Sequence, residues 1–140
     1  MEFRLGLVAL GAPLLALGAW AVLAPRSWFD DFPGGGRHWV SALGPYNEHL
    51  ATDVGAFFIA IGGLLIFAAV VLERRAIQMA LGALLVFSIP HLVWHLGELG
   101  PYDTLDKVLN VISLSLLVVV PIVMLLLLRQ TNSEVTYGTR

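Results

Sequence analysis

The sequence predicts an all-α, polytopic membrane protein in which four transmembrane helices form one antiparallel bundle. Of its 140 residues, 58% are hydrophobic and only 13% are charged, and the mean hydropathy is +0.83. A small soluble domain could not hide so much apolar surface from water. Four apolar runs approach or exceed the ~20 residues needed to cross ~30 Å of hydrocarbon. They cover about residues 5–24, 50–72, 76–96 and 108–128.

The first run has two interpretations, a cleaved signal peptide or a retained helix. Val22, Leu23 and Ala24 offer a small-residue cleavage site, but Pro25 follows directly. The run also exceeds the usual apolar region of about 7–15 residues in a signal peptide. We therefore expect a retained helix.

An outer loop, residues 25–46, follows this first run. Its centre is rich in glycine (Gly34, Gly35 and Gly36) and is flanked by aromatic residues. Loops of this length are often lids or binding loops, and an interfacial segment lying on the headgroups is equally consistent with the pattern.

The remaining runs are joined by short connections. Residues 73–75 separate the second run from the third, and a short segment with Gly97, Gly100 and Pro101 precedes the fourth. Connections this short make neighbouring helices antiparallel. The tail, residues 129–140, is polar and is predicted to be a short, poorly ordered end. The whole chain, residues 1–140, is predicted to be a single transmembrane domain.

The distribution of basic residues predicts the orientation in the membrane. With four spans, one side carries five basic residues and the other carries Arg26, Arg37 and Lys107. The positive-inside rule then places both termini in the cytoplasm of a multi-pass plasma-membrane protein. The five on the cytoplasmic side are Arg4, Arg74, Arg75, Arg129 and Arg140.

Charge and cysteine content exclude several classes of function. The formal net charge is −2, so there is no basic field to bind nucleic acid. The chain has no cysteine, which excludes disulfides, thiol nucleophiles and iron–sulfur clusters. A metal ion would be held by nitrogen and oxygen ligands.

Polar side chains concentrate at the outer end of three predicted helices. Counted from the outer ends, His49, His95 and Asp106 fall at one depth, while Asp53, His91 and Asn110 fall about one turn deeper. Asp53 lies too far inside its helix to act as a cap. It is expected to face the bundle interior, where a partner group offsets the free energy of burying a charge in the membrane. Residues four or seven apart share a helix face, which gives three stripes: His49 with Asp53; His91, His95 and Glu98; and Asp106, Asn110 and Ser113.

The leading hypothesis is a metal site formed by His49, Asp53, His91 and His95. Three imidazoles and a carboxylate suit zinc, iron, manganese or copper. If Asp53 instead accepts a hydrogen bond from an imidazole, an open coordination position remains for a hydrolase or oxidoreductase acting on a lipid-like substrate. Whether the protein is an enzyme stays open. Glu98, Asp106, Asn110 and Ser113 are predicted as the supporting polar shell, although Asp106 also suits a helix-start pair with Asp103.

Two alternatives use the same residues. A b-type haem between His49 and His91 or His95 ranks lower, because it leaves Asp53 unexplained in an apolar pocket. A purely structural hydrogen-bonded network is also consistent, since such contacts contribute only about 0.6 kcal/mol each in bilayers.

Three segments carry a family resemblance: WFDDFP at residues 28–33, GPYNEHL at residues 44–50 and PHLVWHL at residues 90–96. They resemble a group of small, uncharacterised bacterial four-helix membrane proteins that are loosely similar to the DoxX-like class. The resemblance implies a compact four-helix unit and a link to redox or quinone-associated membrane complexes. A further alternative for the function is a non-catalytic accessory or assembly subunit of a respiratory-type membrane complex, with the His/Asp cluster structural. Its partner, a membrane protein or a second copy, would contact small-residue positions such as Gly11, Gly18, Gly62 and Gly63.

Overall fold

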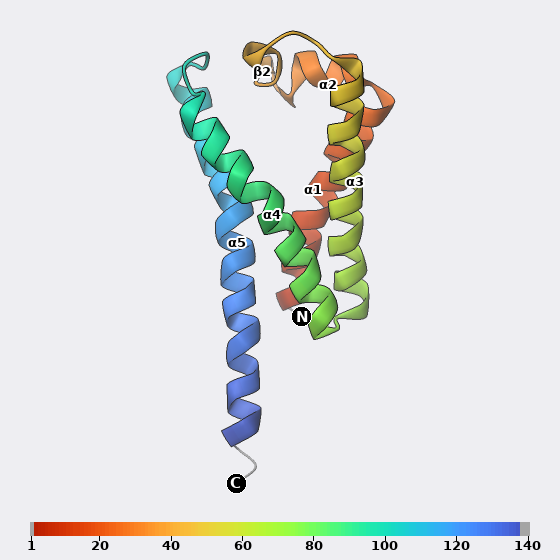
Figure 1. Ribbon diagram of the computed structural model, residues 1–140, viewed down its shortest axis with the longest axis vertical. Coiled ribbons are helices and arrows are strands. Elements are labelled where there is room, and N and C mark those ends of the chain that lie inside the picture. The colour runs from red at the N-terminus through yellow and green to blue at the C-terminus, as the bar shows by residue number, and fades with distance from the viewer. Residues whose placement is uncertain (1, 138–140) are drawn as a thin grey trace.

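Four long helices make up most of the molecule. The computed structural model describes residues 2–137, and side chains as far as residue 130. The helices are α1 (Glu2–Leu23), α3 (Glu48–Val71), α4 (Arg74–Gly97) and α5 (Thr104–Tyr137). Each is long and apolar enough to span a membrane. They run in alternating directions, so both termini lie at the same end (Figure 1). The predicted four-helix membrane bundle is confirmed.

The predicted C-terminal tail begins as a continuation of α5. Residues 129–140 were expected to be a poorly ordered end, but α5 continues as far as Tyr137. The polar residues after Arg129 include no glycine or proline before Gly138, so nothing in the sequence breaks the helical hydrogen bonding. Residues 138–140 lie outside the described part of the chain.

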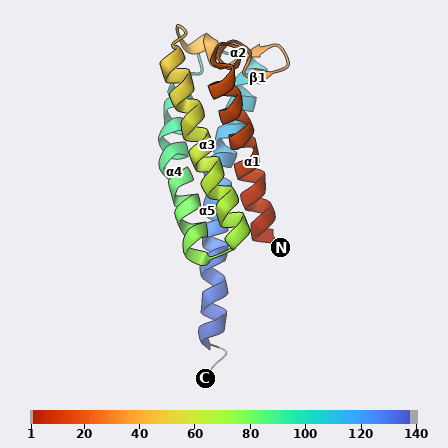
Figure 2. The ribbon, with the colours of Figure 1, turned by 90° about the vertical axis from the view of Figure 1, so that its right-hand side faces the viewer.

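The connection between α1 and α3 is structured. It contains α2 (Pro25–Asp31), a hairpin of β1 (Pro33–Gly34) with β2 (Arg37–His38), and the 3-10 turn η1 (Ser41–Leu43). Pro25 occupies the start of α2, where its missing N–H costs nothing. The connection lies across the end of the bundle at which α3 begins (Figures 1 and 2). We call this the capped end, and the opposite end, with the α3–α4 connection, the terminal end.

Glycines bring α1 and α3 into close contact. A β-carbon at Gly18 would lie 2.6 Å from the carbonyl oxygen of Gly55, and one at Gly62 would lie 2.9 Å from that of Gly11. Both distances are shorter than a normal van der Waals contact. Three of the four glycines predicted to contact a partner are therefore used inside the chain, and Gly63 has open space around its α-carbon.

The buried core is not uniform along the bundle. At the terminal end, one cluster includes side chains of all four long helices, among them Leu7, Leu65, Leu81 and Met124. At the capped end, a second cluster around Trp28 contains described side chains only from α1, α2, α3 and the segment between α2 and α3. The α4–α5 pair diverges from the α1–α3 pair toward this end (Figure 1).

Candidate functional site

The first half of the predicted metal site lies at the start of α3. Asn47 caps the helix by accepting a hydrogen bond from the Leu50 N–H at 3.1 Å. One turn further on, His49 Nε2 lies 3.4 Å from Asp53 Oδ2. The predicted pairing of these two side chains on one face is confirmed.

The prediction that Asp53 faces the bundle interior is wrong in this structure. Its side chain is 61% exposed, and that of His49 is 88% exposed. The capped-end core holds no described side chain from α4 or α5, so the Asp53 face of α3 is left uncovered.

The second half of the predicted site lies on α4 and forms a ladder of rings. His91 stacks on Phe87 with ring centroids 4.9 Å apart, and His95 meets His91 edge-on at 4.6 Å. Trp94 packs edge-on against His95 at 5.0 Å. Within the described residues, the buried Nδ1 of His95 has no hydrogen-bond partner. The two histidines therefore share one face, as their spacing predicts, and one nitrogen is unsatisfied.

Phenylalanines set the register between α3 and α4. The rings of Phe57 and Phe87 have centroids 4.9 Å apart, and those of Phe58 and Phe87 are 5.7 Å apart. The two helices are antiparallel, so Asp53 on α3 and His91 on α4 both lie one turn from this contact toward the capped end. His49 and His95 lie one turn further in the same direction. This register agrees with the two predicted depths.

The predicted four-ligand site is nevertheless not assembled in this structure. Among the described residues, no three His, Asp or Glu side chains lie close enough to hold one metal ion. The physical reason is the divergence of the two helix pairs, because α4 moves away from α3 toward the capped end (Figure 1).

The predicted supporting shell has other partners. Arg37 donates a hydrogen bond and pairs with Asp106. The carboxylate of Asp103 caps α5 by accepting from the Asp106 N–H at 2.8 Å, which confirms the helix-start pair.

Among the described residues, no side chain of the other shell residues forms a hydrogen bond with a histidine ring. Ser113 Oγ donates to the Asn110 carbonyl at 3.0 Å. Asn110 is only 3% exposed, and its buried Oδ1 has no partner among the described residues. Glu98 is exposed at the end of α4, where its N–H donates to the His95 carbonyl at 3.1 Å.

Contacts between residues 37–39 and residues 102–106, at the start of α5 and in the turn before it, were not predicted. Besides the Arg37–Asp106 ion pair, the hydroxyl of Tyr102 donates to the Trp39 carbonyl at 2.7 Å. Tyr102 is 6% exposed. Burial, with a smaller contribution from the Asp106 carboxylate, raises the pKa of Tyr102 to about 12. The phenol is therefore a neutral donor at physiological pH. The Gly34–Gly36 run, a typical hairpin signal, was the available clue to this structure.

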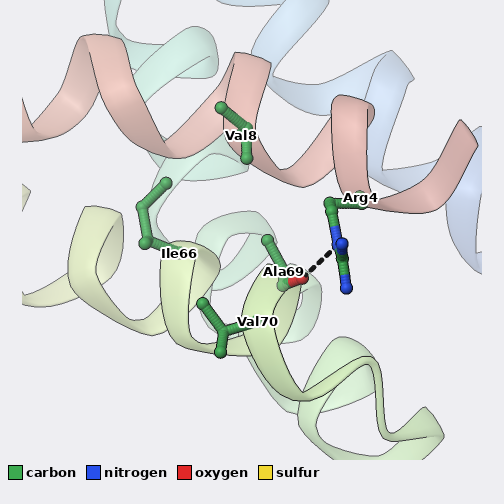
Figure 3. Close-up of a pocket in the computed structure, with 5 residues that line it drawn as sticks. All are labelled: Arg4, Val8, Ile66, Ala69 and Val70. Carbon is green, nitrogen blue, oxygen red and sulfur yellow. Dashed lines mark hydrogen bonds between the residues drawn. The ribbon is translucent and has the colours of Figure 1, made fainter. Parts of the chain in front are cut away.

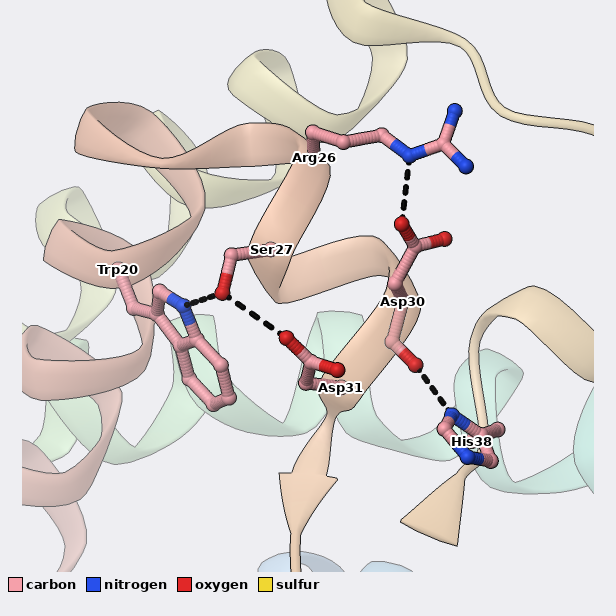
Figure 4. Close-up of polar contacts among 6 residues, drawn as sticks. All are labelled: Trp20, Arg26, Ser27, Asp30, Asp31 and His38. Carbon is pink, nitrogen blue, oxygen red and sulfur yellow. Dashed lines mark hydrogen bonds and ion pairs between the residues drawn. The ribbon is translucent and has the colours of Figure 1, made fainter. Parts of the chain in front are cut away.

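Polar contacts also hold α2 in place (Figure 4). Ser27 Oγ accepts from the Trp20 indole at 3.3 Å and donates to Asp31 at 3.1 Å. Arg26 Nε donates to Asp30 at 2.5 Å, and this contact raises the pKa of Arg26. His38 lies 2.6 Å from the Asp30 carbonyl oxygen and is otherwise exposed. His38 therefore contacts another residue of the α1–α3 connection, and it is not one of the predicted metal ligands.

Comparisons with known proteins assign no family. No protein-family model, no curated protein and no solved structure matches this chain. The DoxX-like resemblance of residues 28–33, 44–50 and 90–96 therefore stays a prediction. The described part of the chain has four helices that are long and apolar enough to cross a membrane.

Proposed function

We propose that this protein binds one divalent transition-metal ion between the capped-end halves of α3 and α4, through His49, Asp53, His91 and His95. The observation that carries the proposal is the Phe57–Phe87 contact. It fixes a register in which Asp53 is level with His91 and His49 with His95. Two pairs of ligands at matching levels are the arrangement that a metal site between neighbouring helices requires.

The types of ligand suit a transition-metal ion, but α3 and α4 must come closer together before the four side chains can bind one ion. Three imidazoles and one carboxylate match zinc, iron, manganese or copper. Within the described residues these groups are not close enough to share an ion. Binding therefore requires α3 and α4 to approach each other beyond Phe57 and Phe87. The uncovered face of Asp53 leaves room for that movement. The Nδ1 of His95 lacks a hydrogen-bond partner among the described residues.

In this proposal the protein is a plasma-membrane protein with both termini in the cytoplasm and the site near the extracytoplasmic face. The basis is the five-to-three bias of basic residues. When bound, the metal supplies Lewis-acid or redox chemistry. With Asp53 as a hydrogen-bond acceptor for an imidazole, a lipid-like substrate would meet an open position from the membrane side.

Metal content of the intact protein, purified in mild detergent, tests the proposal. We expect about one metal ion per chain, and a loss of at least about tenfold in affinity for His49→Ala on α3 and for His91→Ala on α4, because each removes one ligand. His38→Ala is the matched control, since this histidine lies in the hairpin and contacts Asp30. It should bind as the unaltered protein does.

Three outcomes would overturn the proposal. The first is less than about 0.2 metal ions per chain, since an intact site retains its metal during mild purification. The second is equal metal loss in His38→Ala and His91→Ala. The third is a Soret absorption band that disappears in His49→Ala, which would assign the histidines to haem.

A further inference from the structure

A recess at the terminal end of the bundle lies far from the predicted metal site. It has a volume of about 250 Å³ and lies between α1 and α3 (Figure 3). Its lining combines one guanidinium group with apolar side chains. The lining residues are Arg4, Val8, Ile66, Ala69 and Val70.

Arg4 is held at the mouth of this recess with most of its donors unused. Its Nε donates to the Ala69 carbonyl at 3.1 Å (Figure 3). Ala69 is among the last four residues of α3, whose carbonyls lack a partner within the helix. One of the five N–H donors of Arg4 is satisfied in this way, and no second hydrogen bond or ion pair of Arg4 occurs among the described residues. The nearby acids Glu2 and Glu73 form no ion pair in that part of the chain.

The recess is polar near the ends of the two helices and apolar further into the membrane-spanning segments. Arg4 and Ala69 lie near the ends of α1 and α3, whereas Val8 and Ile66 lie about one turn further into the spans. Val8 is 40% exposed and Val70 is 69% exposed, so the recess opens on the outer surface of two membrane-spanning helices. In a bilayer that surface is in contact with lipid.

We propose that the recess binds an anionic phospholipid, with the phosphate on Arg4 and the first part of an acyl chain against Val8, Ile66 and Val70. A guanidinium group with free N–H donors matches a phosphate in geometry and in charge. Further basic residues at the same end, Arg74, Arg75 and Arg129, add to the attraction for anionic headgroups. Arg74 itself donates to the Leu128 carbonyl at 2.7 Å, which leaves Arg4 as the cation that lines the recess.

Lipid binding to the purified, delipidated full-length protein tests this proposal. Native mass spectrometry would count phosphatidylglycerol and phosphatidylcholine bound to each variant. We expect phosphatidylglycerol to bind more tightly, and Arg4→Gln to weaken that binding by about fivefold or more, the effect of one basic residue near an anionic surface. Arg75→Gln is the matched control, because Arg75 is exposed at the same end and does not line the recess. Its charge reaches the bound headgroup only through solvent and is screened by salt, so Arg75→Gln should weaken binding by less than about twofold.

A second variant keeps the charge of Arg4 and removes the space inside the recess. Val8→Trp fills the recess and leaves Arg4 in place, so it should also weaken phosphatidylglycerol binding. It keeps the proposal testable if Arg4→Gln fails to fold.

Several results would overturn the lipid site. Equal losses in Arg4→Gln and Arg75→Gln would indicate diffuse electrostatic attraction only, and equal binding of both lipids would exclude recognition of the anionic headgroup. Unchanged binding in Val8→Trp would exclude the acyl chain from the recess. Displacement of the lipid by millimolar inorganic phosphate would point to a site for free anions instead.

Discussion

At the scale of single residues, Asp53 and Tyr102 show what a sequence pattern can and cannot predict. Asp53 attracts attention because a carboxylate stands inside an apolar helix, and its pairing with His49 follows from a spacing of four residues. Its exposure could not be predicted, since it depends on the path of α4. Tyr102 gives no local signal, because its partner is a backbone carbonyl 63 residues away.

Replacing Tyr102 by Phe should destabilise the protein by about 1–3 kcal/mol, because the buried Trp39 carbonyl then loses its donor. Unfolding in detergent, followed by tryptophan fluorescence, measures this free energy. A change within about 0.5 kcal/mol, the range of ordinary surface substitutions, would show that the bond does not hold Trp39 to the turn before α5.

The ionisation of Tyr102 should depend on folding. Its pKa is raised from 10.0 to about 12 in the folded protein, so the stabilising contribution of the neutral phenol is complete below pH 10 and is lost as the pH rises through 12. Absorbance at the tyrosinate band, compared between the unaltered protein and Tyr102→Phe, isolates this titration. A midpoint near pH 10 for the difference curve would contradict the burial of this side chain.

Asp53→Asn separates a ligand role from a structural role. The side chain is largely exposed, so the free energy of unfolding should change by less than about 0.5 kcal/mol. Metal affinity should fall by about 10–100-fold, whether Asp53 binds the ion directly or orients an imidazole. Thermal unfolding and metal titration on the same preparation measure both quantities. Unchanged metal affinity would remove Asp53 from the site.

At the scale of elements, the close approach of α1 and α3 depends on glycine. The sequence shows Gly11, Gly18, Gly62 and Gly63 as small positions suited to helix contact, but not whether the contact lies inside the chain or with a partner. The structure uses three of them between α1 and α3, together with Gly55. Which face of an apolar helix meets protein and which meets lipid cannot be determined from hydropathy, because both are apolar.

Gly18→Ala should therefore be destabilising, by about 1–3 kcal/mol, since its β-carbon would lie 2.6 Å from the backbone oxygen of Gly55. Gly63→Ala is the matched control. It adds the same methyl group in open space and should be neutral or stabilising by up to about 1 kcal/mol, because alanine favours the helix. Equal effects of the two substitutions on unfolding in detergent would contradict the packing of α1 on α3.

At the scale of the whole molecule, the sequence is sufficient for the number, positions and directions of the spans. Long apolar runs and short connections determine these features, and the four helices agree with the predicted spans to within a few residues at most boundaries. The continuation of α5 as far as Tyr137 is consistent with a sequence that has no glycine or proline between Arg129 and Gly138. The divergence of the two helix pairs could not be predicted, because it depends on which helix faces pack, and the capped-end core forms without α4 and α5.

The distance between α3 and α4 tests the central claim most directly. Because the chain has no cysteine, spin labels can be attached at Leu50→Cys and Leu96→Cys, two exposed positions beside the predicted ligands. Pulsed electron–electron double resonance should show a shorter distance after one equivalent of Zn²⁺, and the shift should be absent when His91 is also replaced by Ala. A distance distribution that is unchanged by Zn²⁺, in protein that remains folded, would contradict a metal site closed by the approach of these helices.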